Sequence, residues 1–135
     1  MAGTTDLSQL LASMEPVLSQ DPYGYVALAP GGCVPPDLTC FATISEDEGL
    51  TLIAPSTSLA GAGLDPGPAW ARISLTVHSD LEAVGLTAAF AAALGREGIS
   101  ANVVAGYFHD HIFVQWARRD DAVAALRALA AAAKA

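Results

Sequence analysis

The second half of the chain alternates between two hydrophobic periodicities, and the order of these segments leaves few folds open. Apolar side chains occupy every second position over 72–78, 99–106 and 111–117, as in strands with one buried face. They recur at helical spacing over 86–94 and again over 119–133. This β-α-β-β-α order predicts an α+β sandwich, in which helices cover an antiparallel sheet.

The first half of the chain carries a related set of signals. Asp6 stands three residues before Gln9, a pair that can cap the first turn of a helix. The elements expected after this helix are a strand over 23–29, a hairpin formed by 41–46 and 50–54, and a short helix over 56–64 capped by its serines and threonine. The order again mixes strands and helices.

The strongest break in the sequence is Asp65-Pro66-Gly67-Pro68, because proline and glycine interrupt both helices and strands. It lies between the two sets of signals. We therefore expect two related units in tandem, residues 1–68 and 69–135, which share one apolar interior.

The segment between the first strand of the second half and its helix suggests a helix start. Ser79 stands three residues before Glu82, which is the spacing of a capping box. Gly85 would then lie one turn into the helix, where glycine costs about 1 kcal/mol relative to alanine. Two explanations stay open for Gly85: access for a ligand, or close packing of the helix on the sheet.

The triplet His109-Asp110-His111 is the most reactive-looking cluster. In an extended strand, His109 and His111 would project to the same face, as two metal ligands can, and His78 could add a third. No further side chain stands at a recognisable ligand spacing, so we expect a polar turn over 107–110 and no metal. The following strand would place Ile112, Val114 and Trp116 on one face, with His111, Phe113 and Gln115 on the other.

Charge is distributed unevenly along the 135 residues, which carry a formal net charge of −8. All six basic residues follow position 71, so the excess of acids belongs to the first half. A chain with no basic stripe repels phosphate backbones, which argues against nucleic-acid partners and against anchoring to anionic membranes.

Two cysteines, Cys33 and Cys40, supply too few ligands for a structural zinc site, and the apolar composition needs no disulfide scaffold. Alanine accounts for much of that composition, and no stretch has the about 18 apolar residues of a membrane span. The polar residues 1–6 do not resemble a signal peptide. We expect a cytoplasmic protein with reduced thiols.

Four stretches resemble small standalone bacterial ACT-domain proteins. They are RISLTVHSDLEAVGLTAAFAAAL (72–94), GISANVVAGYFHDHIFV (98–114), EDEGLTLIAP (46–55) and LSQLLASMEPVL (7–18). The resemblance implies a βαββαβ ferredoxin-like fold in two tandem ACT-like units, related to the regulatory ACT pairs of aspartate kinases. In one respect the sequence departs from the family, because Ser79–Gly85 replaces the usual Asp-x-Pro-Gly turn.

The resemblance also implies where a ligand would bind. ACT domains bind amino acids at interfaces between units, through the loop between the first strand and first helix and through the second strand. A helix N-terminus in this loop suits a carboxylate, and an asparagine amide can both donate and accept. The matching positions here are His78, Ser79, Asp80, Gly85, Leu86, Ile99, Ser100, Ala101 and Asn102.

From these observations we expect a regulatory protein that binds a small molecule, an amino acid by resemblance, with no enzymatic activity and no cofactor. Asp80 would pair with a ligand ammonium, and Asn102 would contact the polar end of the ligand. A homodimer or higher homo-oligomer is expected because edge strands pair readily. The alternative is an oligomerisation or protein-interaction module of the same fold without a ligand.

Overall fold

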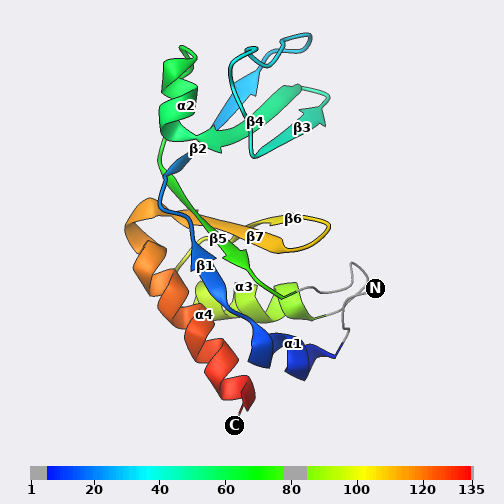
Figure 1. The fold of residues 1–135 in the computed structure, drawn as a ribbon, viewed down its shortest axis with the longest axis vertical. Helices are drawn as coiled ribbons and strands as arrows, with labels where there is room; N and C mark the ends of the chain where they lie inside the picture. Colours follow the sequence, from blue (N-terminus) through cyan, green and yellow to red (C-terminus); the bar gives the residue numbers. More distant parts are fainter. Residues whose placement is uncertain (1–5, 78–84, 135) are drawn as a thin grey trace. The chain divides into compact units, whose positions relative to one another are not determined.

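The computed structural model describes residues 6–77 and 85–134, and the chain forms two compact units (Figure 1). The smaller unit is Gln20–Trp70. The larger unit combines the segments on either side, Met1–Ser19 and Ala71–Ala135. Spatial compactness therefore divides the chain differently from two consecutive halves, because the N-terminal segment packs with the C-terminal one.

Four antiparallel strands and three α-helices build the larger unit. The strands are β1 (Pro16–Leu18), β5 (Trp70–Leu75), β6 (Asn102–Ala105) and β7 (Asp110–Gln115), and the helices are α1 (Leu7–Ser13), α3 (Leu86–Arg96) and α4 (Arg119–Lys134). Strand β7 lies between β5 and β6, while β1 pairs with β5 in the register Val17↔Ser74. The β-α-β-β-α order expected for this part of the chain is confirmed.

The core of the larger unit is apolar and draws on all three helices. Leu10 of α1, Phe90 of α3 and Leu126 of α4 are fully buried against Ile73 and Ile112 of the sheet. This arrangement explains the helical spacing in the sequence, because one stripe of each helix faces the strands. Asp6 caps α1 as expected, since its side chain accepts a hydrogen bond from the Gln9 backbone at 3.2 Å.

Two features of this unit differ from what the sequence indicated. Strand β1 was not anticipated, because three residues beginning at Pro16 are too few to show a periodicity. The expected alternation over 111–117 fails as well. Phe113 is fully buried, although it was placed with the polar positions, and Trp116 begins the 3-10 turn η1 (Trp116–Arg118) instead of continuing β7.

The smaller unit contains three antiparallel strands and one short helix. Its elements are β2 (Tyr23–Leu28), β3 (Ala42–Glu46), β4 (Gly49–Pro55) and α2 (Ser56–Gly61), with β4 between β3 and β2. The expected hairpin is confirmed, and Glu46 pairs with Gly49 across its turn. At the far end of β2, Tyr23 pairs with Trp70.

One buried cluster supports the smaller unit: Leu38, Leu52, Ala54 and Leu59. Gly24 of β2 has no room for a side chain, because an added Cβ would lie 2.5 Å from the Pro66 carbonyl oxygen. The expected cap of α2 is wrong: the N-cap position is Pro55, and no side chain caps the helix. The segment between Leu28 and Ala42 forms turns and no helix.

No helix among the described residues combines the length and the apolar character needed to cross a membrane.

Candidate ligand-binding site

The N-terminus of α3 begins later than the sequence suggested. Gly85 occupies the N-cap position with φ +100°, and it makes no side-chain capping bond. The helix therefore does not start from Ser79, and Gly85 does not lie one turn inside it. A left-handed φ of this size explains the glycine, because a residue with a Cβ adopts it only at a cost.

Close packing adds to this requirement. A Cβ built on Gly85 would lie 3.0 Å from the Leu7 Cδ2 atom of α1. Of the two explanations left open for Gly85, close packing agrees with the structure, although the neighbour is a helix and not the sheet. Leu86, which follows it, is buried in the core and offers only its backbone to a ligand.

His78, Ser79 and Asp80 lie outside the described residues. Val77 and Gly85 are the described residues on either side of this segment, and both belong to the larger unit. Val77 is contacted by the hairpin that joins β6 to β7, since His109 Nδ1 lies 3.4 Å from the Val77 carbonyl oxygen. The tip of that hairpin thus lies at the end of the sheet where β5 leads towards α3.

The hairpin tip exposes two aromatic side chains that the sequence analysis did not single out. Tyr107 is 72% exposed and Phe108 63%, and their rings meet edge to face with 5.1 Å between centroids. The Gly106 backbone N–H closes the turn by donating to the His109 carbonyl at 2.9 Å. Two adjacent aromatic residues in a turn could have been noted as candidates for a contact surface.

His111 lies half-buried on β7 and contacts the neighbouring strand. Its Nδ1 atom is 2.8 Å from the Ser74 hydroxyl. Burial lowers the pKa of His111, and the nearby charges of Arg72 and His109 lower it further. Burial also raises the pKa of the adjacent Asp110. Each shift favours the uncharged form of its group.

The histidine triplet does not assemble a metal site in the part of the chain that is described. No three His, Cys, Asp or Glu side chains in 6–77 and 85–134 come together as ligands would. His109 and His111 instead contact a backbone carbonyl and a hydroxyl, respectively.

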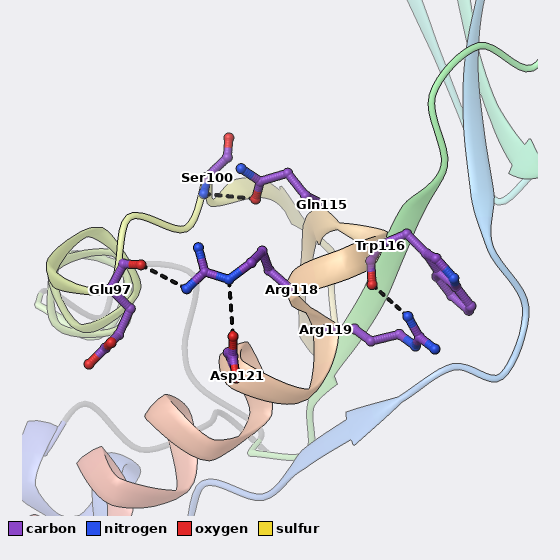
Figure 2. A network of polar contacts seen from close by, with 7 residues as sticks. All are labelled: Glu97, Ser100, Gln115, Trp116, Arg118, Arg119 and Asp121. Carbon is purple, nitrogen blue, oxygen red and sulfur yellow. Dashed lines mark hydrogen bonds and ion pairs between the residues drawn. The ribbon is translucent and has the colours of Figure 1, made fainter.

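The second group of expected site residues lies where α3 leads into β6. Ile99 is buried in the core, and Ala101 packs against it. The Ser100 backbone N–H donates to Gln115 Oε1 at 3.0 Å (Figure 2). Asn102 donates its side-chain N–H to the Phe113 carbonyl at 3.3 Å. The Ser100 backbone N–H and the Asn102 side-chain N–H, which a ligand could use, therefore already have partners within the protein.

The structure does not bring Gly85 and Leu86 together with Ile99–Asn102. Gly85 and Leu86 begin α3, whereas Ile99–Asn102 follow its C-terminal end. A helix of 11 residues is about 16 Å long at 1.5 Å per residue. One amino acid cannot span that length, so within this unit Gly85 and Leu86 cannot contact the same ligand as Ile99–Asn102.

Arg118 lies at the Ile99–Asn102 end of α3, and no pattern in the sequence indicates its role. Its Nη2 atom donates to the Glu97 carbonyl at 2.9 Å, and its Nε atom pairs with Asp121 at 3.1 Å (Figure 2). It therefore fixes the end of α3 to the first turn of α4. Arg119 instead lies 4.0 Å above the Trp116 ring and donates to the Trp116 carbonyl.

Comparisons with known proteins agree with this architecture. Two family models match in succession, both described as ACT domain, over residues 2–68 and 67–128. A Vibrio cholerae protein of unknown function, described as a possible transport protein, is 45% identical with a TM-score of 0.82; the match covers 93% of this chain and 97% of that one. The chain belongs to the ACT-domain family.

More distant structures share the ACT fold. An Agrobacterium tumefaciens protein is 18% identical with a TM-score of 0.71, covering 87% of this chain and 89% of that one. The regulatory subunit of aspartate kinase from Thermus thermophilus is 11% identical with a TM-score of 0.64, covering 87% and 97%. A comparison with curated proteins found no match.

Both expectations drawn from the resemblance, the family and the ferredoxin-like ACT fold in two units, are confirmed. ACT domains are regulatory, ligand-binding modules. In the ACT domain matched by residues 67–128, β5 is the first strand, α3 the first helix and β6 the second strand. The N-terminus of α3 therefore lies at one end of the segment where the resemblance implied a ligand loop, and residues 78–84 of that segment lie outside the described residues.

Proposed function

We propose that this protein is a cytoplasmic regulatory sensor that binds a free amino acid at the start of α3. The observation that carries the proposal is the pair of consecutive ACT-domain matches, which together extend over residues 2–128. Ligand binding would stabilise one arrangement of the protein and shift its population towards it, as linkage requires. No catalytic step is needed for this role.

The chemistry of the α3 N-terminus supports an anionic group at this position. The first turn of a helix carries backbone N–H groups without intrahelical partners and the positive end of the dipole. Gly85 supplies no side-chain acceptor to cap them. In the proposed complex, the ligand carboxylate accepts from this turn, while Asp80 pairs with the ligand ammonium and His78 and Ser79 complete the loop.

Residues Ile99–Asn102 take a different part in the proposal. Since they lie at the far end of α3, they would contact a ligand bound to the α3 N-terminus of another copy, not one bound to their own. ACT domains bind amino acids at interfaces between units, which agrees with this arrangement. The ligand site would then be complete only in the homo-oligomer. Ser100 and Asn102 would then exchange their present partners, Gln115 and the Phe113 carbonyl, for the ligand.

Thermal melting against each of the twenty amino acids at millimolar concentration tests the proposal. A ligand present at 100 times its Kd adds about 2.7 kcal/mol of stability, which raises Tm by several degrees. We expect one amino acid, or one chemical class, to do so, and we expect Asp80→Asn to abolish the shift. Asp65→Asn, which removes an exposed acid from a loop of the smaller unit, is the matched control and keeps the shift.

A flat response to all twenty amino acids would contradict the sensor and favour the second function, an ACT module that only mediates protein association. One observation favours this alternative. The donors of Ser100 and Asn102 are already occupied, as expected of a position that stabilises an edge strand and binds nothing. Association of the protein in the absence of any ligand effect would then be its activity.

A further inference from the structure

A groove runs between β1 and α4 on the surface of the larger unit. It encloses about 360 Å³, and it is lined by Pro16, Leu18, Asp120, Val123, Ala124 and Arg127. Figure 1 shows the blue strand β1 beside the orange-to-red helix α4. Both elements belong to the same compact unit, so the groove is a feature of that unit alone.

The α4 side of this groove has an ordered charge pattern. Asp120, Val123, Ala124 and Arg127 stand at positions i, i+3, i+4 and i+7, which lie along one face of a helix. The acid and the base are therefore about 10 Å apart, with two apolar side chains between them. A face that is negative at one end, apolar in the middle and positive at the other is complementary to itself when reversed.

We propose that this groove is the contact surface for a second copy of the chain, with the two α4 helices antiparallel across a two-fold axis. An axis between Val123 and Ala124 places Asp120 of each copy opposite the partner subunit's Arg127. At the axis, Val123 faces the partner subunit's Ala124, and Ala124 faces the partner subunit's Val123. An isologous contact requires such a self-complementary patch, and opposite charges at both ends fix its orientation.

The present partner of Arg127 does not prevent this contact. Its Nη2 atom lies 3.8 Å from Glu15 Oε1, and both side chains are more than 60% exposed. An exposed ion pair of this length is weak. Asp120 of the partner subunit can therefore replace or share it. This interface is distinct from edge-strand pairing, because its charged contacts come from α4 and not from β3 or β6.

Charge reversal measured by sedimentation velocity tests the proposal. The series is made in a Glu15→Gln background, so that position 127 has no charged partner at position 15. We expect Asp120→Arg or Arg127→Asp to weaken the dimer at least about tenfold, because symmetry repeats each like-charge contact twice. The double variant Asp120→Arg/Arg127→Asp restores opposite pairs and should return the Kd to within about threefold of the background value.

Controls separate this effect from a loss of folding. Glu48→Arg makes the same change of charge at an exposed turn of the smaller unit, away from the groove residues, so it should leave the Kd unchanged. Glu15→Gln alone should tighten the dimer, because it removes a competitor for Arg127. Melting temperatures identify any variant that is merely unstable.

Cysteine cross-linking supplies a second measurement. In a Cys33→Ser/Cys40→Ser background, Ala124→Cys should form a disulfide dimer under mild oxidation, because this position lies at the axis. Ala132→Cys, on another side of α4 towards α3, should not. A monomeric protein at all concentrations, a failure of the double variant to restore the dimer, or equal cross-linking at both positions would overturn the proposal.

Discussion

The two compact units belong to a chain that matches ACT-domain models over residues 2–128, yet they differ in how many apolar residues they bury together. The larger unit has fifteen buried residues in one cluster, beneath three α-helices. The smaller unit, Gln20–Trp70, has four, beneath a helix of six residues. Membership of a fold family therefore does not fix local stability, and we expect the smaller unit to open at a lower free energy.

The same comparison separates the candidate functions. An 11-residue helix begins at Gly85 in the larger unit, whereas turns occupy the stretch between β2 and β3 in the smaller one. The smaller unit also contains only acids among its charged residues. If the proposed function holds, a carboxylate ligand is expected in the larger unit and not in the smaller one.

Truncation of the two cores should give the largest effects. Phe90→Ala removes a fully buried ring from the larger cluster and is expected to cost about 3–5 kcal/mol of unfolding free energy. Leu59→Ala, in the smaller cluster, should cost about 2–5 kcal/mol and should lower amide protection chiefly within Gln20–Trp70. Urea unfolding and segment-resolved hydrogen exchange measure both. Equal loss of protection throughout the chain after Leu59→Ala would contradict the difference between the units.

Replacement of Gly85 probes the helix start that only the larger unit has. Gly85→Ala should destabilise the protein by at least about 1–2 kcal/mol, because alanine resists a φ of +100° and its Cβ would press on Leu7. Gly95→Ala is the matched control: it lies in the same helix with nothing within 4 Å of the new Cβ, so it should stabilise by about 0.5–1 kcal/mol. Chemical denaturation should show that Gly85→Ala lowers the free energy of unfolding and that Gly95→Ala raises it.

Capping provides a smaller contrast between the units. Asp6→Ala removes a real cap from α1 and should cost about 1 kcal/mol. Ser56→Ala, at the start of α2, should change stability by less than about 0.5 kcal/mol, because the Ser56 hydroxyl is buried with no partner among the described residues. If Ser56→Ala cost as much as Asp6→Ala in thermal melting, the assignment of Pro55 as the N-cap of α2 would be mistaken.

The smallest expected effect is a pH dependence confined to the larger unit. Because the pKa of His111 is lowered on folding, the unfolded chain binds more protons than the native protein just below pH 6.5. Stability should fall as the pH drops from 6.5 to the folded pKa, and His111→Asn should remove this slope. The smaller unit has no histidine. Amide protection in Gln20–Trp70, corrected for the intrinsic exchange rate, should therefore not show this fall with pH.

Periodic segments of the fold were predictable from the sequence. The β-α-β-β-α order, the hairpin of β3 and β4 and the Asp6 cap all follow from patterns that local sequence carries. Phe113 was misplaced because period-two alternation assumes one buried face, and this strand buries consecutive residues. Strand β1 was missed because its pairing with β5 depends on residues almost sixty positions away.

The candidate site was harder to predict for a similar reason. Ser79 and Glu82 have the spacing of a capping box, but the left-handed Gly85 sets where α3 begins. Resemblance joined Gly85 and Asn102 in one site, although a whole helix separates them in this unit. Arg118 has no sequence signature, since its partner is a backbone carbonyl at Glu97 that any residue could supply.

The interleaving of the larger unit has a consequence for how the chain is made. Helix α1 and strand β1 emerge from the ribosome first, but β5 and α4, the elements that they pack against, follow only after residues 20–70. Their apolar faces have no packing partner while the middle of the chain is synthesised, at about 5–20 residues per second. The core of the larger unit is therefore completed only after the middle segment has been synthesised. A gene cut at residue 69 would leave its second product without one strand and one helix of its core.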